Sequence, residues 1–154
     1  MDAVVSLPVK IRNLLREDLK SVLQIEQMSF DDCWSETDFY NAFSSGAYGK
    51  VAHRNGVIVG YCIYEKNRRS IELLSVAVHP WYRGFGVSRE LVLRVKLEMD
   101  ARRRHVEATV SERNLEAQKW MRALNFRCIE TFKDYFGQNC DGYRFRFQPD
   151  FIYA

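Results

Sequence analysis

A short glycine-bearing turn, R-G-F-G-V-S-R over residues 83–89, carries the clearest chemical signal in the sequence. The apolar run from Ile71 to Val78 precedes it and is typical of a strand buried on both faces, which Pro80 ends because proline cannot donate to a strand ladder. A helix is predicted from Phe85 to about Arg104, since apolar side chains recur there every four residues. Backbone N–H groups and the positive end of the helix dipole meet at such a turn, and glycine lets an anion approach closely. The turn therefore predicts a phosphate site.

Two common phosphate-binding loops do not fit these residues. The P-loop needs a Lys-Ser/Thr pair after its last glycine, whereas Val87 and Ser88 follow Gly86. The dinucleotide fingerprint G-x-G-x-x-G needs a third glycine where Arg89 stands. The pattern that is left is R-x-x-G-x-S, beginning at Arg83.

This pattern resembles the R/Q-x-x-G-x-G/A turn with which the GNAT superfamily of acyl-CoA N-acyltransferases holds the pyrophosphate of coenzyme A. The flanking sequence V-A-V-H-P-x-Y-R resembles that family as well. The resemblance implies that acetyl-CoA is the co-substrate and that no metal is needed. By position in the family's motif, the implied cofactor-binding residues are Val76, Val78, Arg83, Gly84, Phe85, Gly86, Val87, Ser88, Arg89 and Asn114.

The order of the predicted elements along the chain is β-α-α-β-β-β-α-β-α-β-β, which is the GNAT order. Ser35 followed by Asp38 predicts the start of a short helix, and Asn55-Gly56 predicts a hairpin turn. The block that begins at Asn114 resembles the family's N-x-x-A-x-x-x-Y-x-x-x-G-F sequence, with Trp120 in place of the Tyr. These features imply an α+β fold with a central mixed sheet of about seven strands and four helices, in a single domain over residues 1–154.

Acidic and aromatic residues resemble those of a subgroup. I-E-x-x-x-F and W-S-x-x-x-F in residues 25–39 are similar to the substrate groove of ribosomal-protein alanine N-acetyltransferases, the RimI type, although core packing also accounts for these aromatics. The hairpin around Tyr135 resembles that of amino-terminal acetyltransferases. The resemblance implies that Glu26, Phe30 and Tyr135 line the substrate end of the cleft and that the acceptor is a protein N-terminal α-amine. A small-molecule amine as acceptor and a catalytically silent acyl-CoA-binding module are the alternatives.

The general base is the point at which the sequence departs from the subgroup. Aminolysis of a thioester needs a neutral amine and a donor for the oxyanion, and the family supplies the donor from the backbone N–H at the position of Val76. RimI-type enzymes have a Glu base and a Tyr acid where this chain has Thr109 and Trp120. Glu72 matches the base position of histone-type members and is the predicted base, with Glu107 as the second candidate. Glu72 could instead be a solvent-facing or ion-paired strand carboxylate.

Composition limits the other function classes. The 154 residues are 47% hydrophobic and 28% charged, with a net charge of +3 that is too small to indicate a nucleic-acid partner. The short run 102–104 of arginines is interpreted as suiting the end of the preceding helix. Four cysteines without C-x-x-C spacing argue against a zinc site or a disulfide framework, and no run is apolar enough for a membrane span. We expect a cytoplasmic monomer or homodimer without nucleic-acid or membrane partners.

Overall fold

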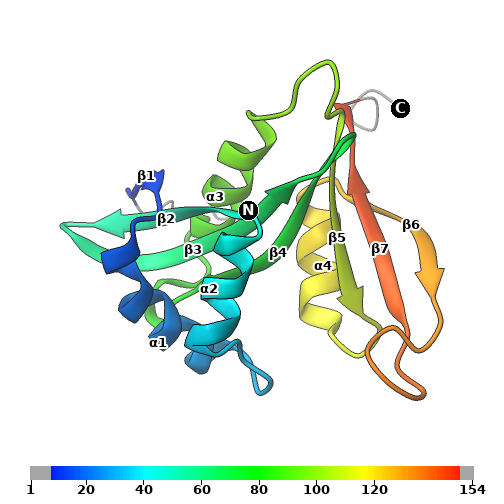
Figure 1. Ribbon diagram of the computed structural model, residues 1–154, viewed down its shortest axis with the longest axis horizontal. Coiled ribbons are helices and arrows are strands. Elements are labelled where there is room, and N and C mark those ends of the chain that lie inside the picture. Colours follow the sequence, from blue (N-terminus) through cyan, green and yellow to red (C-terminus); the bar gives the residue numbers. More distant parts are fainter. Residues whose placement is uncertain (1–7, 150–154) are drawn as a thin grey trace, which may run out of the picture. The chain divides into compact units, whose positions relative to one another are not determined.

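The structure is a computed structural model that describes residues 8–149, and Figure 1 shows the succession of its elements. Within that range it has seven strands, four α-helices and two 3-10 helices. Their bounds are β1 (Lys10–Asn13), η1 (Arg16–Asp18), α1 (Leu19–Ser29), α2 (Glu36–Ser44), β2 (Tyr48–Arg54), β3 (Val57–Lys66), β4 (Ser70–Val78), η2 (Pro80–Tyr82), α3 (Val87–Lys96), β5 (His105–Ser111), α4 (Leu115–Ala123), β6 (Arg127–Phe132) and β7 (Gly142–Phe147). The predicted order of strands and α-helices is confirmed.

The seven strands form one sheet in the order β1-β2-β3-β4-β5-β7-β6. β4 and β5 are parallel, with Glu72 opposite Glu107, whereas β5 and β7 are antiparallel, with Thr109 opposite Arg144. A parallel pair needs a crossover connection, and α3 lies in the connection between β4 and β5. The sheet is therefore mixed, as the sequence predicted.

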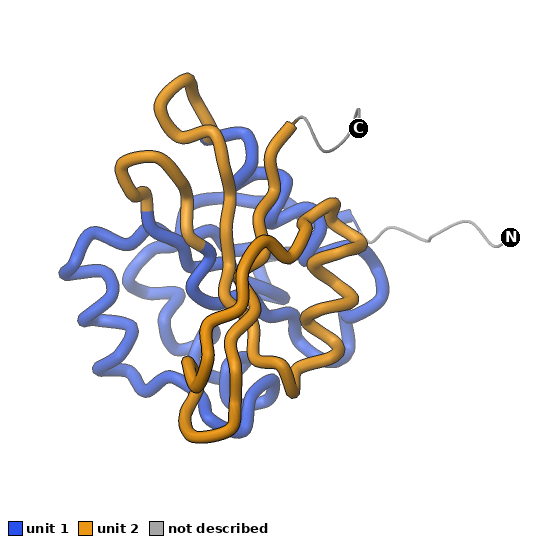
Figure 2. Tube along the Cα trace, turned by 90° about the vertical axis from the view of Figure 1, so that its right-hand side faces the viewer, with its two compact units in different colours: residues 1–65, 73–98 blue, residues 66–72, 99–154 orange. Residues whose placement is uncertain are grey.

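The chain divides into two compact units, which Figure 2 shows in different colours. The first consists of residues 1–65 and 73–98, and the second of residues 66–72 and 99–154. β4 begins in the second unit and continues into the first, so Glu72 belongs to the second unit and Val76 to the first. That the whole chain is one domain stays a prediction.

In the first unit, helices pack on both faces of the strands. Gly60 lets β3 and α3 pack closely, because a Cβ at this position would lie 3.2 Å from the Val87 side chain and 3.3 Å from the Leu91 side chain. Its neighbour Tyr61 points to the opposite face, because side chains alternate along a strand. On that face a core forms with residues of α1 and α2; its buried members are Leu19, Val22, Ile25, Phe39, Val51, Tyr61, Ile63 and Ala77.

Two predictions about local structure are wrong. The helix expected to reach Arg104 ends at Lys96. Over residues 100–103 a turn replaces helix, because the Asp100 side chain accepts the N–H groups of Arg102 at 2.9 Å and Arg103 at 2.7 Å. The arginine run therefore lies in the loop before β5 and not at a helix end. β4 is not buried on both faces, since buried residues alternate with half-buried ones over most of its length.

Candidate active site

The predicted anion turn lies at the start of α3. Gly86 is the residue before the first helical turn and has φ +81°, while Gly84 has φ +83°. Both angles are in the left-handed region, where a side chain is strained, and a Cβ at either position would meet nothing within 4 Å. Glu90 N–H donates to Gly86 O at 3.1 Å, which makes Gly86 the first intrahelical acceptor. The N-terminal end of α3 is thus open and has the backbone that an anion site needs.

Arg83 fixes the chain where it enters this turn. Its Nε donates to Val78 O at 2.9 Å and one terminal nitrogen donates to Ser29 Oγ at 3.0 Å, which ties the end of β4 to the end of α1. The predicted cofactor residue Arg83 is therefore also a structural link within the first unit. Asn114 begins α4 in the second unit, where its side chain accepts Ala117 N–H at 3.0 Å.

A buried carboxylate organises the segment after α1. Glu26 is only 2% exposed, and it accepts hydrogen bonds from Trp34 N–H at 3.1 Å, from Ser75 Oγ at 3.1 Å and from the hydroxyl of Tyr61. Burial, followed by the charge of Glu26, raises the pKa of Tyr61, so this phenol stays protonated and donates. Phe30 caps the end of α1 and packs against the core of the first unit. Both predicted substrate residues thus have a structural role in this unit.

Tyr135 presents an exposed aromatic surface in the second unit. It is 56% exposed and contacts Phe136 edge to face, with ring centroids 4.9 Å apart. Gly142 at the start of β7 leaves room for Tyr135, because a Cβ there would lie 2.9 Å from Tyr135 Cβ and 3.0 Å from Thr109 Cγ2. The glycine lets Tyr135 cross close to β7.

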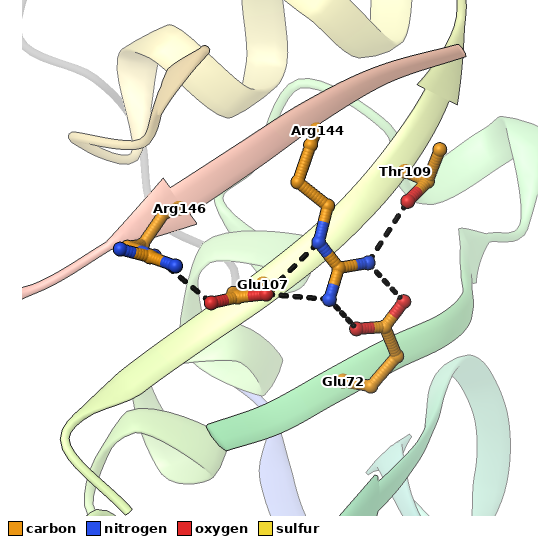
Figure 3. Close-up of polar contacts among 5 residues, drawn as sticks. All are labelled: Glu72, Glu107, Thr109, Arg144 and Arg146. Carbon is orange, nitrogen blue, oxygen red and sulfur yellow. Dashed lines mark hydrogen bonds and ion pairs between the residues drawn. The ribbon is translucent and has the colours of Figure 1, made fainter. Parts of the chain in front are cut away.

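Glu72 lies in a network of four charged side chains and one hydroxyl, all within the second unit (Figure 3). Arg144 is its centre: Nη1 donates to Glu72 Oε1 at 2.7 Å and to Thr109 Oγ1 at 2.9 Å, and Nε donates to Glu107 Oε2 at 2.9 Å. Arg146 Nε donates to the other oxygen of Glu107, also at 2.9 Å. Two carboxylates thus face two guanidinium groups.

The electrostatics of the network favour its ionised form. Burial of Arg144 lowers its pKa, but the hydrogen bonds and charges of Glu72 and Glu107 outweigh that effect and raise the pKa overall. A guanidinium at this distance stabilises a carboxylate in its charged form and makes it a weaker proton acceptor. Glu107 is buried with its two oxygens bonded to different guanidinium groups, whereas both oxygens of Glu72 lie 2.7 Å from Arg144. Both candidates for the base are therefore ion-paired in this structure.

The arginines of this network were not identified from the sequence. Arg144 and Arg146 stand two residues apart in β7, in the alternating sequence Y-R-F-R-F. Alternation on a strand places both on one face, and the register pairs them with Thr109 and Glu107 of β5. The alternation was the signal that could have revealed them.

Within residues 8–149, no group of three or more His, Cys, Asp or Glu side chains is placed to hold a metal ion. None of the helices in the same range is long and apolar enough to cross a membrane.

Comparison with known proteins decides the family. The model of the acetyltransferase (GNAT) family matches residues 10–126, which is most of the chain. The chain belongs to this family. The predictions of a GNAT fold and of an N-acetyltransferase are confirmed.

Individual relatives agree with the family match. A putative [ribosomal protein bS18]-alanine N-acetyltransferase of Bacillus subtilis is 28% identical over 134 residues, which cover 84% of this chain and 87% of the relative. The crystal structure of the ribosomal-protein-S18-alanine N-acetyltransferase from Escherichia coli has a TM-score of 0.81 at 22% identity, covering 92% of this chain and 94% of that one. Arabidopsis thaliana NAA60 in complex with acetyl-CoA has a TM-score of 0.79 at 19% identity, covering 92% and 99%.

Proposed function

We propose that this GNAT acetyltransferase transfers the acetyl group of acetyl-CoA directly to the α-amine of a protein N-terminus. The observation that carries the proposal is the match to a ribosomal-protein alanine N-acetyltransferase, which extends over 84% of the chain. The resemblance of the segment 25–39 and of the Tyr135 hairpin to that subgroup supports the same acceptor. We expect the protein to act in the cytoplasm as a monomer or a homodimer.

The residues of the turn fit acetyl-CoA. Gly84 and Gly86 have a left-handed backbone and open space around them, at the positive end of the α3 dipole. A phosphate group needs both features to approach the backbone. We assign the pyrophosphate to residues 83–89, and Asn114 is carried over from the family's motif as a further cofactor-binding residue. Val78 is assigned to the amides of the pantetheine arm. The bound co-substrate supplies an acetyl thioester, whose thiolate leaves readily because a thiol has a pKa of about 8.5.

The chain's own groups supply the rest of the reaction. The backbone N–H of Val76 is assigned as the donor to the developing oxyanion, and Glu72, four residues earlier in β4, as the base that removes the proton of the amine. Thr109 cannot be a base, but it accepts a hydrogen bond from Arg144 and helps to orient that guanidinium beside Glu72. The base therefore acts when Glu72 is released from Arg144, directly or through one water.

The acceptor decides between this function and its alternatives. We would incubate the protein and acetyl-CoA with a peptide that begins with alanine, with the same peptide carrying a formylated N-terminus and an internal lysine, and with spermidine. Mass spectrometry of the products should show one acetyl group on the free peptide and none on the blocked one. Turnover of spermidine alone would favour a small-molecule enzyme. Thermal stabilisation by acetyl-CoA without turnover of any acceptor would favour a silent acyl-CoA-binding module.

A further inference from the structure

A basic hollow of about 470 Å³ lies in the second unit, formed by the turn between β3 and β4 and the loop before β5. Four of its six lining residues are arginines. The lining residues are Arg68, Arg69, Ala101, Arg102, Arg104 and His105. The two segments are more than 30 positions apart in the sequence, so the sequence alone does not indicate that their charges meet.

Hydrogen bonds hold the two segments of this basic hollow together. Arg104 N–H donates to Arg69 O at 3.3 Å, and Arg103 Nε donates to Asn67 O at 2.8 Å. The carboxylate of Asp100 is used inside the loop, where it accepts two backbone N–H groups and lies 3.7 Å from Arg103. The backbone N–H groups of Arg103 and Arg102 accordingly lower the pKa of Asp100. The arginines of the basic hollow thus lie on two segments that hydrogen bonds hold together.

The arginines of the basic hollow form no ion pair within the described residues. Within residues 8–149, no carboxylate lies within ion-pair distance of the four lining guanidinium groups. Arg104 Nε donates to Ala101 O at 3.0 Å, which orients its guanidinium without reducing its charge. Like charges brought together in a concave site repel one another, and the field is focused there. The arrangement costs free energy that an anion would recover.

We propose that the basic hollow is a binding site for a small anion with two or more phosphate groups. Arginine presents a planar fork that matches phosphate oxygens in two-point hydrogen bonds. A di- or triphosphate concentrates several negative charges in a small volume, as four arginines around one hollow require, whereas an acidic peptide has at most one charge per residue. Among the described residues, no Phe, Tyr or Trp lines the hollow, so these residues offer no aromatic platform for a nucleobase. Recognition is through the phosphates.

The basic hollow is separate in its residues from the proposed acetyl-CoA turn. None of its lining residues lies in the turn 83–89, and all of them belong to the second unit, whereas the turn belongs to the first. The proposal therefore does not rest on the acetyl-transfer function.

Isothermal titration calorimetry of the full chain with sodium tripolyphosphate tests the proposal. The main variant is Arg68→Gln/Arg102→Gln, because both side chains are exposed and make no hydrogen bond that holds the loops. The matched control is Arg54→Gln/Arg94→Gln, which removes the same charge from two exposed arginines outside the hollow. Gly86→Ala reports on binding at the turn. Arg69→Gln provides a second variant of the hollow if the first loses its fold by circular dichroism.

The expected result is a saturable binding event whose dissociation constant rises about tenfold or more in the hollow variant, since each charge-assisted hydrogen bond contributes appreciably. The control and Gly86→Ala should retain this binding event, even if tripolyphosphate also binds the turn, and added salt should weaken it. Equal losses in the hollow variant and the control would mean that only net charge matters and would overturn the proposal. Loss of binding only in Gly86→Ala would also overturn the proposal. So would a failure of tripolyphosphate to saturate the protein by about 1 mM, even if duplex RNA binds.

Discussion

Glu72 and Arg144 form a two-point ion pair, with each carboxylate oxygen 2.7 Å from one terminal nitrogen of the guanidinium. The same guanidinium also bonds Glu107, so a single positive charge is shared between the predicted base and its competitor. A paired carboxylate is held in place and in its charged form, but its proton affinity is reduced. If Glu72 is the base, Arg144 sets how strong a base it is.

Replacing Glu72 tests its proposed role directly. Glu72→Gln keeps the size of the side chain and removes its basicity, so we expect kcat at neutral pH to fall by about 10²–10⁴. Activity should recover partly as the pH approaches the pKa of about 8 of the peptide α-amine, because the amine then loses its proton without help. The measurement is a pH profile of kcat. Full activity in Glu72→Gln, together with loss in Glu107→Gln, would place the base on β5.

Replacing Arg144 separates stability from basicity. Arg144→Gln leaves two nearly buried carboxylates with Arg146 alone, and we expect the free energy of unfolding to fall by about 3–5 kcal/mol. Loss of the positive charge beside Glu72 should move the acidic limb of the pH profile to higher pH. Arg146→Gln is the control, since within residues 8–149 the side chain of Arg146 bonds Glu107 and not Glu72. An unmoved acidic limb in Arg144→Gln would exclude coupling to the base.

The two glycines with φ +81° allow a matched test of the acetyl-CoA turn. Gly86 and Gly56 have the same φ, and a Cβ at either would meet nothing within 4 Å, so Gly86→Glu and Gly56→Glu carry similar backbone strain. Only Gly86→Glu adds a negative charge and bulk to the proposed phosphate site. Thermal shift with saturating acetyl-CoA should be lost in Gly86→Glu and kept in Gly56→Glu. Equal shifts in both would remove the cofactor from this turn.

Local patterns were sufficient to predict most elements. Ser35 and Asp38 form the predicted helix start, with Asp38 N–H donating to Ser35 Oγ at 3.1 Å and Ser35 N–H donating to the Asp38 carboxylate at 2.8 Å. Asn55 has the positive φ, +51°, that an Asn-Gly hairpin turn allows. These features depend on residues close together in the chain, so the sequence contains their full cause.

Features that depend on distant residues could not be predicted in the same way. The four-residue repeat of apolar side chains predicted too long a helix for α3. Such a repeat does not show that the Asp100 side chain bonds the backbone N–H groups of Arg102 and Arg103. The partner of Glu72 is 72 positions away in β7, and the basic hollow joins two loops. Such contacts depend on strand order and register, which are known only once the fold is known.

Asp18 connects stability to pH in the first unit. Arg12 bonds both of its oxygens, at 2.6 and 2.9 Å, and chiefly these hydrogen bonds, with Leu15 N–H, lower the pKa of Asp18 although burial opposes them. A lowered pKa in the folded state contributes stability above the unfolded pKa of about 4, and that contribution is lost as the pH falls through the folded pKa. Asp18→Asn should cost about 1–3 kcal/mol at pH 7, and this cost should shrink as the pH falls through the folded pKa of Asp18. Denaturant unfolding at a series of pH values from 7 downward measures this, with the exposed Asp32→Asn as control. A loss that does not change with pH would contradict the linkage.

Tyr135 distinguishes acceptor binding from co-substrate binding. Its ring is more than half exposed beside that of Phe136, which is 46% exposed, so neither side chain is needed to fill a core. If Tyr135 contacts the peptide, Tyr135→Ala should raise KM for the peptide about tenfold, because a buried aromatic contact contributes about 1.5 kcal/mol, while KM for acetyl-CoA stays unchanged. Phe136→Ala is the matched control and should change neither constant to that extent. Steady-state kinetics with each substrate varied in turn gives both values. A similar rise of both KM values in Tyr135→Ala would show that the hairpin has shifted as a whole, and would remove Tyr135 from the acceptor site.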